Sequence, residues 1–507
     1  MKNKTLNLGI ASIMGLALLS LTAISCNNDD TSDMMSSATA PDVNFTALAS
    51  NNTILTYNAK NLATSTSSTA IVGLPASENI VSIDYRPATG QLYGLGSSSR
   101  LYLINEKSGV ATALGSASFS PTIASNNASV DFNPTVDRIR LVTDSGQNLR
   151  LHPELGIVVA TDGVINGGAN AKIGAIAYTN SMAGASTTVL YDVDFDQDKL
   201  YMQNLPNDGA LQLVGNLGVN FEGVGDMDIM PDNTTALAVT NSNSISSLFT
   251  IDLMTGKAVN VGKFTASVIS IAFKTNPIAY ATTATNMLVR FNPTNGTNNS
   301  VALTGLATNE TIVGIDFRPA NGSLYAVSNQ SRLFTVNTAS GALTVIGTGL
   351  TPALSGTSFG FDINPTVDRI RLVSNTGQNL RLHPDLGTVV ATDGNLNPGT
   401  PFVTGAAYTN NFAGATTTAL FVIDSQMDAL FRQDPPNNGT LVSIGNLGVN
   451  VDADSGFDIG GTSTTAFALL KVNNVTGIYT INTVTGAATK VGDLNIQATA
   501  MAVGLGF

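Results

Sequence analysis

Arginine and histidine are concentrated in two nearly identical segments of this chain. The only two histidines stand near the ends of GQNLRLHPELG and GQNLRLHPDLG, 231 residues apart, and a DRIRLV segment precedes each. Side chains alternate between the two faces of a strand, so a hairpin of these segments places three arginines and a histidine on one surface. These residues are Arg138, Arg140, Arg150 and His152 in the first half, and Arg369, Arg371, Arg381 and His383 in the second.

This cationic surface admits three interpretations. The guanidinium group of arginine suits bidentate pairing with carboxylates, and we favour an internal network with His152 as a hydrogen-bonding member. The same surface could instead bind an anionic ligand, such as an acidic sugar or a peptide carboxylate. A catalytic histidine needs a nucleophile and an orienting partner, and no serine or cysteine motif suits that role, so we predict no catalytic residue. The carboxylates nearby in the sequence are Asp137, Glu154 and Asp162, with counterparts Asp368, Asp385 and Asp393.

Aspartate recurs at equivalent places in short apolar segments such as IDYRP, VDFNP and MDIMP. The six residues are Asp84, Asp131 and Asp228, then Asp316, Asp362 and Asp458. Three carboxylates brought together could bind a cation through oxygen ligands, and two suffice for glycoside hydrolysis. We favour a role in capping the following turn or in a hydrogen-bond network. The sequence contains no zinc-ligand spacing and no glycine-rich phosphate loop, so we predict no metal and no cofactor.

The elements that carry these residues are internal repeats. Residues 131–163 and 362–394 are identical at 27 of 33 positions, and shorter matches flank them. The chain is therefore a tandem duplication. Within each half, a unit of four strands joined by turns recurs about every 46 residues, a spacing typical of four-stranded propeller blades.

The ends of the two halves predict how the blades close. The N-terminal region supplies only three strands, and 267–274 has the pattern of the missing first strand; 499–507 in the same way completes the three strands in 278–306. Such closure removes exposed sheet edges. We therefore predict an all-β protein with two tandem five-bladed β-propellers, residues 43–274 and 275–507. The six aspartates then lie on first strands, which line the axial channel, and one ten-bladed ring is the alternative.

The N-terminus has the features of a bacterial lipoprotein signal. Two lysines precede an apolar run from Ile10 to Ile24, and small residues lead to Cys26, the only cysteine. We predict a signal peptide over 1–25 and a lipidated, palmitate-bearing Cys26 that begins a flexible tether over 26–42. The acidic NNDD after the cysteine resembles a surface-export tether, so we expect a lipid anchor in the outer membrane and exposure at the cell surface. The alternative is an ordinary cleaved signal with an incidental cysteine.

Three segments carry a family resemblance: GIDFRPANGSLYAV, NPTVDRIRLVSNTGQNLRLHPDLGTVVATDG and GAAYTNNF. They resemble the bacterial family catalogued as domain of unknown function 4394. The resemblance covers nearly the whole chain after the tether, twice. It implies a secreted or surface β-propeller-like protein, and it implies no particular activity.

The charge balance limits the possible partners. The net charge is −12 and only 11% of the residues are charged, so the chain offers no cationic stripe for nucleic acid. We predict a non-catalytic cell-envelope lipoprotein that acts as a binding or scaffold module for a protein, a peptide or an anionic glycan. The alternative is a glycan-active hydrolase or lyase that uses the first-strand aspartates in the propeller channel.

Overall fold

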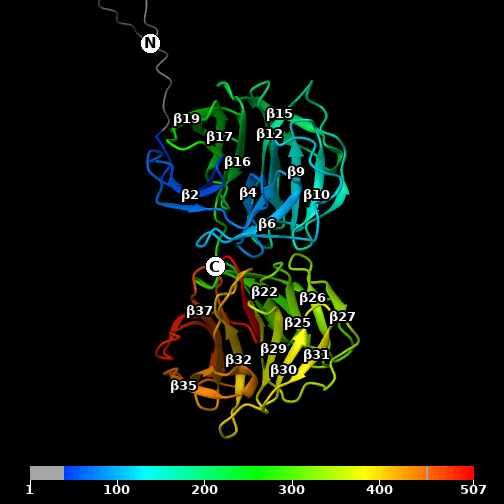
Figure 1. The fold of residues 1–507 in the computed structure, drawn as a ribbon, viewed down its shortest axis with the longest axis vertical. Helices are drawn as coiled ribbons and strands as arrows, with labels where there is room; N and C mark the ends of the chain where they lie inside the picture. Colours follow the sequence, from blue (N-terminus) through cyan, green and yellow to red (C-terminus); the bar gives the residue numbers. More distant parts are fainter. Residues whose placement is uncertain (1–38, 453–454) are drawn as a thin grey trace, which may run out of the picture. The chain divides into compact units, whose positions relative to one another are not determined.

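The computed structural model describes residues 39–452 and 455–507, which form β-strands almost throughout (Figure 1). Within these ranges there are ten four-stranded antiparallel sheets and no α-helix, only the 3-10 turns η1 (Pro206–Asp208) and η2 (Pro436–Asn438). None of the described residues therefore belongs to a helix that could cross a membrane. The predicted signal peptide and lipidated Cys26 lie outside the described residues.

The first half supplies five sheets. Their strands are β1 (Asn44–Ala49), β2 (Thr53–Asn58), β3 (Ser67–Ala70), β4 (Ile80–Tyr85), β5 (Leu92–Gly96), β6 (Arg100–Ile104), β7 (Ala111–Ala113), β8 (Ala128–Asn133), β9 (Arg138–Thr143), β10 (Asn148–His152), β11 (Ile157–Thr161), β12 (Ile173–Tyr178), β13 (Leu190–Asp194), β14 (Lys199–Gln203), β15 (Leu211–Asn216), β16 (Val224–Ile229), β17 (Ala236–Ser242), β18 (Ile245–Ile251), β19 (Ala258–Lys263) and β20 (Val268–Ala272).

The second half supplies the other five sheets. Their strands are β21 (Ala279–Thr283), β22 (Met287–Phe291), β23 (Asn298–Ala302), β24 (Ile312–Phe317), β25 (Leu324–Ser328), β26 (Leu333–Val336), β27 (Leu343–Ile346), β28 (Phe359–Asn364), β29 (Arg369–Ser374), β30 (Asn379–His383), β31 (Thr388–Thr392), β32 (Val403–Tyr408), β33 (Leu420–Asp424), β34 (Ala429–Gln433), β35 (Leu441–Asn446), β36 (Ser455–Ile459), β37 (Ala466–Val472), β38 (Val475–Ile481), β39 (Ala488–Asp493) and β40 (Ala498–Val503).

Each half closes into its own ring of five blades. The innermost strands of the first ring, β4, β8, β12, β16 and β20, contact one another in that order, and β20 returns to β4; β24, β28, β32, β36 and β40 do the same in the second ring. The closing blades have the orders β20-β1-β2-β3 and β23-β22-β21-β40. Figure 1 shows the consequence: the blue β2 lies in one ring with the green β17 and β19. The prediction of two five-bladed propellers is confirmed, and the ten-bladed alternative is wrong.

The core lies between neighbouring blades, whose apolar faces pack against each other. At the closure of the first ring, Phe45 and Tyr57 from the first two strands contact Phe264 from the end of the preceding blade. The rings of Tyr57 and Phe264 are 5.1 Å apart in an edge-on arrangement, which aromatic pairs prefer. Burying such a side chain contributes about 1.5–3 kcal/mol, so the core seals the ring as well as the strand pairing.

A tight turn fixes the spacing of the residues that concern function. The NPTVD segment joins β8 to β9, and Asp137 occupies the left-handed region there with a φ of 52°. Aspartate tolerates this conformation better than most residues, and its amide donates to the Asn133 carbonyl. The turn places Asp131 on the innermost strand and Arg138 at the start of the second strand of the same blade.

Candidate functional site

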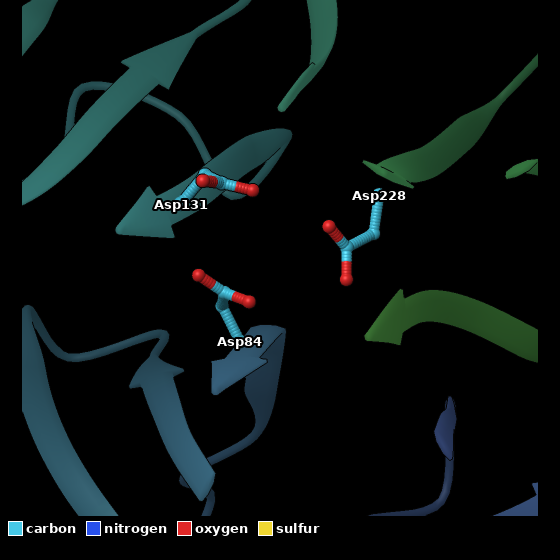
Figure 2. A group of neighbouring side chains, drawn as sticks. All are labelled: Asp84, Asp131 and Asp228. Atoms are coloured by element: carbon cyan, nitrogen blue, oxygen red, sulfur yellow. The ribbon is translucent and has the colours of Figure 1, made fainter. Parts of the chain in front are cut away.

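The six first-strand aspartates meet in two groups of three, one in each ring. In the first ring, Asp84 of β4, Asp131 of β8 and Asp228 of β16 point toward one another (Figure 2). One carboxylate oxygen from each lies within 4.8 Å of the others, and the three residues are at most 4% exposed. The second group has the same arrangement and is 1% exposed at every member: Asp316, Asp362 and Asp458. We call these groups the axial triads.

Backbone amides of the innermost strands bind the first axial triad. Asp84 accepts hydrogen bonds from the amides of Tyr85 and, on the next strand, Phe132, both at 2.7 Å. Asp131 accepts from the amide of Tyr178 at 3.2 Å, and Asp228 accepts from that of Phe273 at 2.5 Å. The aspartates therefore link successive first strands around the ring. This is a network role, and its amide donors are not those of the turns that follow.

Burial and mutual repulsion disfavour ionisation of these carboxyls. Burial, followed by the charge of Asp228, raises the pKa of Asp84 well above its usual value. Burial and then the charge of Asp84 do the same to the pKa of Asp131. Burial raises the pKa of Asp228 to about 8 and, in the second ring, that of Asp458 to about 7. Near neutral pH, such a group of carboxyls retains protons unless a cation compensates its charge.

A fourth axial carboxylate, Asp226, was not singled out from the sequence. It lies two residues before Asp228 on β16 and accepts hydrogen bonds from the hydroxyls of Ser82, Ser129 and Ser270 at 3.0, 2.6 and 2.5 Å. Burial raises its pKa to about 7. The signal for it is the DMD pattern, because residues two apart on a strand face the same side.

The same level of the second ring carries no such cluster. Its axis is lined there by small residues that leave a hollow of about 10 Å³, among them Gly314, Gly360, Gly456 and Ala500. The two axial triads thus have the same carboxylates but different surroundings. Hydroxyls and a fourth carboxylate fill the first axis, whereas the second keeps a space close to the minimum for one water molecule.

The arginine segments form the expected hairpin. Strands β9 and β10 pair with Arg140 opposite Arg150. Asp162 joins these two arginines, since its Oδ2 accepts from Arg140 Nη1 at 2.6 Å and from Arg150 Nε at 2.7 Å. In the second ring, Asp393 holds Arg371 and Arg381 at the same two distances. One carboxylate in each ring therefore neutralises only part of the cationic surface.

Two of the three expected carboxylate partners bind elsewhere. Asp137 and Glu154 pair with Arg86, an arginine that sequence reasoning missed, at 2.9 Å from Nε and 2.8 Å from Nη2. The corresponding residues Asp368 and Asp385 pair with Arg318 at 2.8 and 2.6 Å. The repeated RP of DYRP and DFRP was the available signal. It was overlooked because the partners lie 50 to 68 residues away, on the next blade.

His152 is a member of this network and lacks a catalytic partner. Its Nδ1 accepts a hydrogen bond from the amide of Glu154 at 3.3 Å. Burial, followed by the charge of Arg138, lowers its pKa, which favours the neutral ring. His383 accepts the amide of Asp385 in the same way at 3.2 Å. The geometry assigns both histidines to holding the chain reversal after the strand.

Arg138 is the part of the cationic surface that stays open. Among the described residues it has no carboxylate within ion-pair distance, and its Nη1 donates to the Asp137 carbonyl at 2.8 Å. It lines a cavity of about 390 Å³ together with Arg140, Tyr178 and the half-exposed to exposed side chains of Val136 and Leu205. Arg369 makes the equivalent bond to the Asp368 carbonyl.

Comparison with known proteins agrees with the duplication. A family model described as Domain of unknown function (DUF4394) matches the chain twice, over residues 53–272 and 287–504. The two matches cover nearly all of both rings. A comparison with curated proteins finds no match.

Proposed function

The chain belongs to the DUF4394 family, and from this premise we propose that it is a non-catalytic, lipid-anchored envelope protein that binds a carboxylate-bearing partner. The partner is a peptide, a segment of a protein or an acidic glycan. One observation carries the proposal: Arg138 lines a cavity and has no carboxylate partner among the described residues. No activity is inherited from the family, whose function is unknown.

The chemistry of this cavity suits a carboxylate. Asp162 already accepts hydrogen bonds from both Arg140 and Arg150, so it offers little compensation to Arg138. Arginine binds planar anions through two parallel donors, and the apolar surfaces of Val136 and Leu205 can cover the remainder of a ligand. A ligand site of this kind combines apolar walls with a few polar groups.

The hydrolase alternative has weaker support. A glycosidase needs two carboxyls that reach the sugar and a nearby water. The axial aspartates are buried, and all but one of them accept hydrogen bonds from backbone amides. The cavity at Arg138 is lined by Asp208 as its only acidic residue.

Binding is tested with a glycan array and a panel of acidic peptides, using the full chain in detergent. We expect a carboxylate-bearing ligand whose affinity falls about 10- to 100-fold in Arg138→Gln, because one charge-assisted interaction is lost. Lys60→Gln is the matched control, since it removes one positive charge from an exposed side chain of the same ring. The proposal is wrong if no ligand is found, or if Arg138→Gln binds as well as the wild type.

The lipid anchor is the second part of the proposal, and it rests on the sequence around Cys26. We expect radiolabelled palmitate to be incorporated into the wild-type chain and not into Cys26→Ser. Because one substitution removes the acylated atom, the variant is also expected in the soluble fraction after cell lysis. Equal labelling of both chains would contradict the anchor and leave the binding proposal untouched.

A further inference from the structure

Asp362, on β28 in the second axial triad, is a buried carboxylate without a partner. It is 1% exposed, and neither of its oxygens has a hydrogen bond within the described parts of the chain. Its counterpart in the first ring, Asp131, does accept an amide hydrogen bond. A buried polar group without a partner is costly, so the unsatisfied oxygens of Asp362 need an occupant.

The other two members of the second axial triad are held in place around it. Asp316 accepts from the amides of Phe317 and Ile363, both at 2.7 Å. Asp458 accepts from the amides of Ile459 and Val503, both at 2.6 Å. These bonds fix two carboxylates on separate strands, and a carboxylate oxygen keeps a further lone pair after one hydrogen bond. Each of the three aspartates offers an oxygen within 4.8 Å of the others.

The charge of the second triad has no internal compensation. Among the described residues, the ion pairs of lysine and arginine involve other carboxylates. Buried charges are normally paired or coordinate metals. We propose that Asp316, Asp362 and Asp458 form a binding site for a divalent cation, with Ca²⁺ preferred, on the axis of the second ring.

The donor atoms determine the choice of cation. The ligands are carboxylate oxygens without nitrogen or sulfur, which suits Ca²⁺ and Mg²⁺ better than softer metals. Ligands on opposite sides of Ca²⁺ lie at most about 5 Å apart, whereas Mg²⁺ brings them to about 4 Å. Oxygens within 4.8 Å of one another therefore fit around Ca²⁺. The adjoining hollow of about 10 Å³, lined by glycines, is close to the size needed for one water ligand.

The competing occupant is a proton. Burial, followed by the charge of Asp316, raises the pKa of Asp362 well above its usual value, so a shared proton also relieves the repulsion. The two occupants differ in their response to added metal. A cation site stabilises the fold when Ca²⁺ is added, because the ion binds the native state alone. A protonated cluster gives no such response.

The test uses the full chain in detergent, stripped with EDTA and then titrated with CaCl₂ and, separately, with MgCl₂. We expect the Tm to rise with Ca²⁺, to rise less with Mg²⁺, and to fall again with EDTA. Elemental analysis after equilibration should find calcium, and Asp362→Asn should reduce the calcium content by one ion per chain. Its affinity should fall more than about tenfold, since even changes to groups behind metal ligands reach that size.

Asp131→Asn is the matched control, because it makes the same change at the same position of the first ring. It should leave the calcium ion of the second ring in place. The proposal is overturned if the wild-type chain binds neither Ca²⁺ nor Mg²⁺, or if Asp362→Asn keeps the wild-type calcium content. If Asp362→Asn does not fold, Asp458→Asn and the wild-type titration decide in its place, and a wild-type Tm that ignores Ca²⁺ overturns the proposal.

Discussion

Asp393 controls two arginines of the second ring with a single carboxylate. It accepts hydrogen bonds from Arg371 and Arg381, and it is nearly buried. Burial raises its pKa, but the hydrogen bonds and charges of Arg381 and Arg371 outweigh this and lower the pKa below the usual 3.8. A carboxyl whose pKa is lower in the folded than in the unfolded chain stabilises the fold above the unfolded pKa. That contribution is lost as the pH falls below about 4.

Asp393→Asn should therefore destabilise the second ring in a pH-dependent way. At pH 7 we expect a loss of about 3 kcal/mol or more in the free energy of unfolding, because Arg371 is left as a buried charge without its partner. The difference from the wild type should shrink between pH 4 and pH 2.5, measured by urea unfolding. Asp434→Asn breaks an exposed pair with Arg432 and should cost at most about 1 kcal/mol. A pH-independent difference for Asp393→Asn would contradict this account.

At the same scale, the sequence predicts which residues gather but not all their partners. Alternation within a hairpin was enough to bring Arg140 beside Arg150. The pairing of Asp137 with Arg86 depends on how two blades are staggered, and no local pattern encodes that stagger. For the same reason, the amide donors of the axial aspartates could not be predicted, since they belong to the next strand around the ring.

At the scale of elements, the repeat predicts the closure of each ring. Strands left over at the ends of the halves need partners, because an open sheet edge invites association. The pairings of β20 with β1 and of β40 with β21 supply them. The sequence could not predict the level of the axis at which the two rings differ. There, Ser82, Ser129 and Asp226 stand against three glycines, and each exchange looks neutral until the strands converge.

At the scale of the whole molecule, duplication has placed the same motif in two environments within one compact unit, residues 37–507. Arg86 of the first ring is completely buried, because the second ring completes its network. Its Nη1 donates to the Gly322 carbonyl at 3.0 Å, and the Ser323 hydroxyl donates to Glu154 at 2.8 Å. In the second ring, the partners of Arg318 remain accessible to water, with Asp368 37% and Asp385 58% exposed at the side chain.

This difference predicts unequal costs for one substitution made twice. Arg86→Gln leaves Asp137 buried without its cation, so we expect a loss of about 3–5 kcal/mol in the free energy of unfolding. Arg318→Gln frees carboxylates that water can solvate, and its cost should be at least about 2 kcal/mol smaller. Urea unfolding of the two variants beside the wild type measures both costs. Because Arg86 also binds the Gly322 carbonyl, its loss should make the first ring unfold at a lower urea concentration than the second. Equal costs at the two positions would show that contact between the halves does not strengthen the network of Arg86.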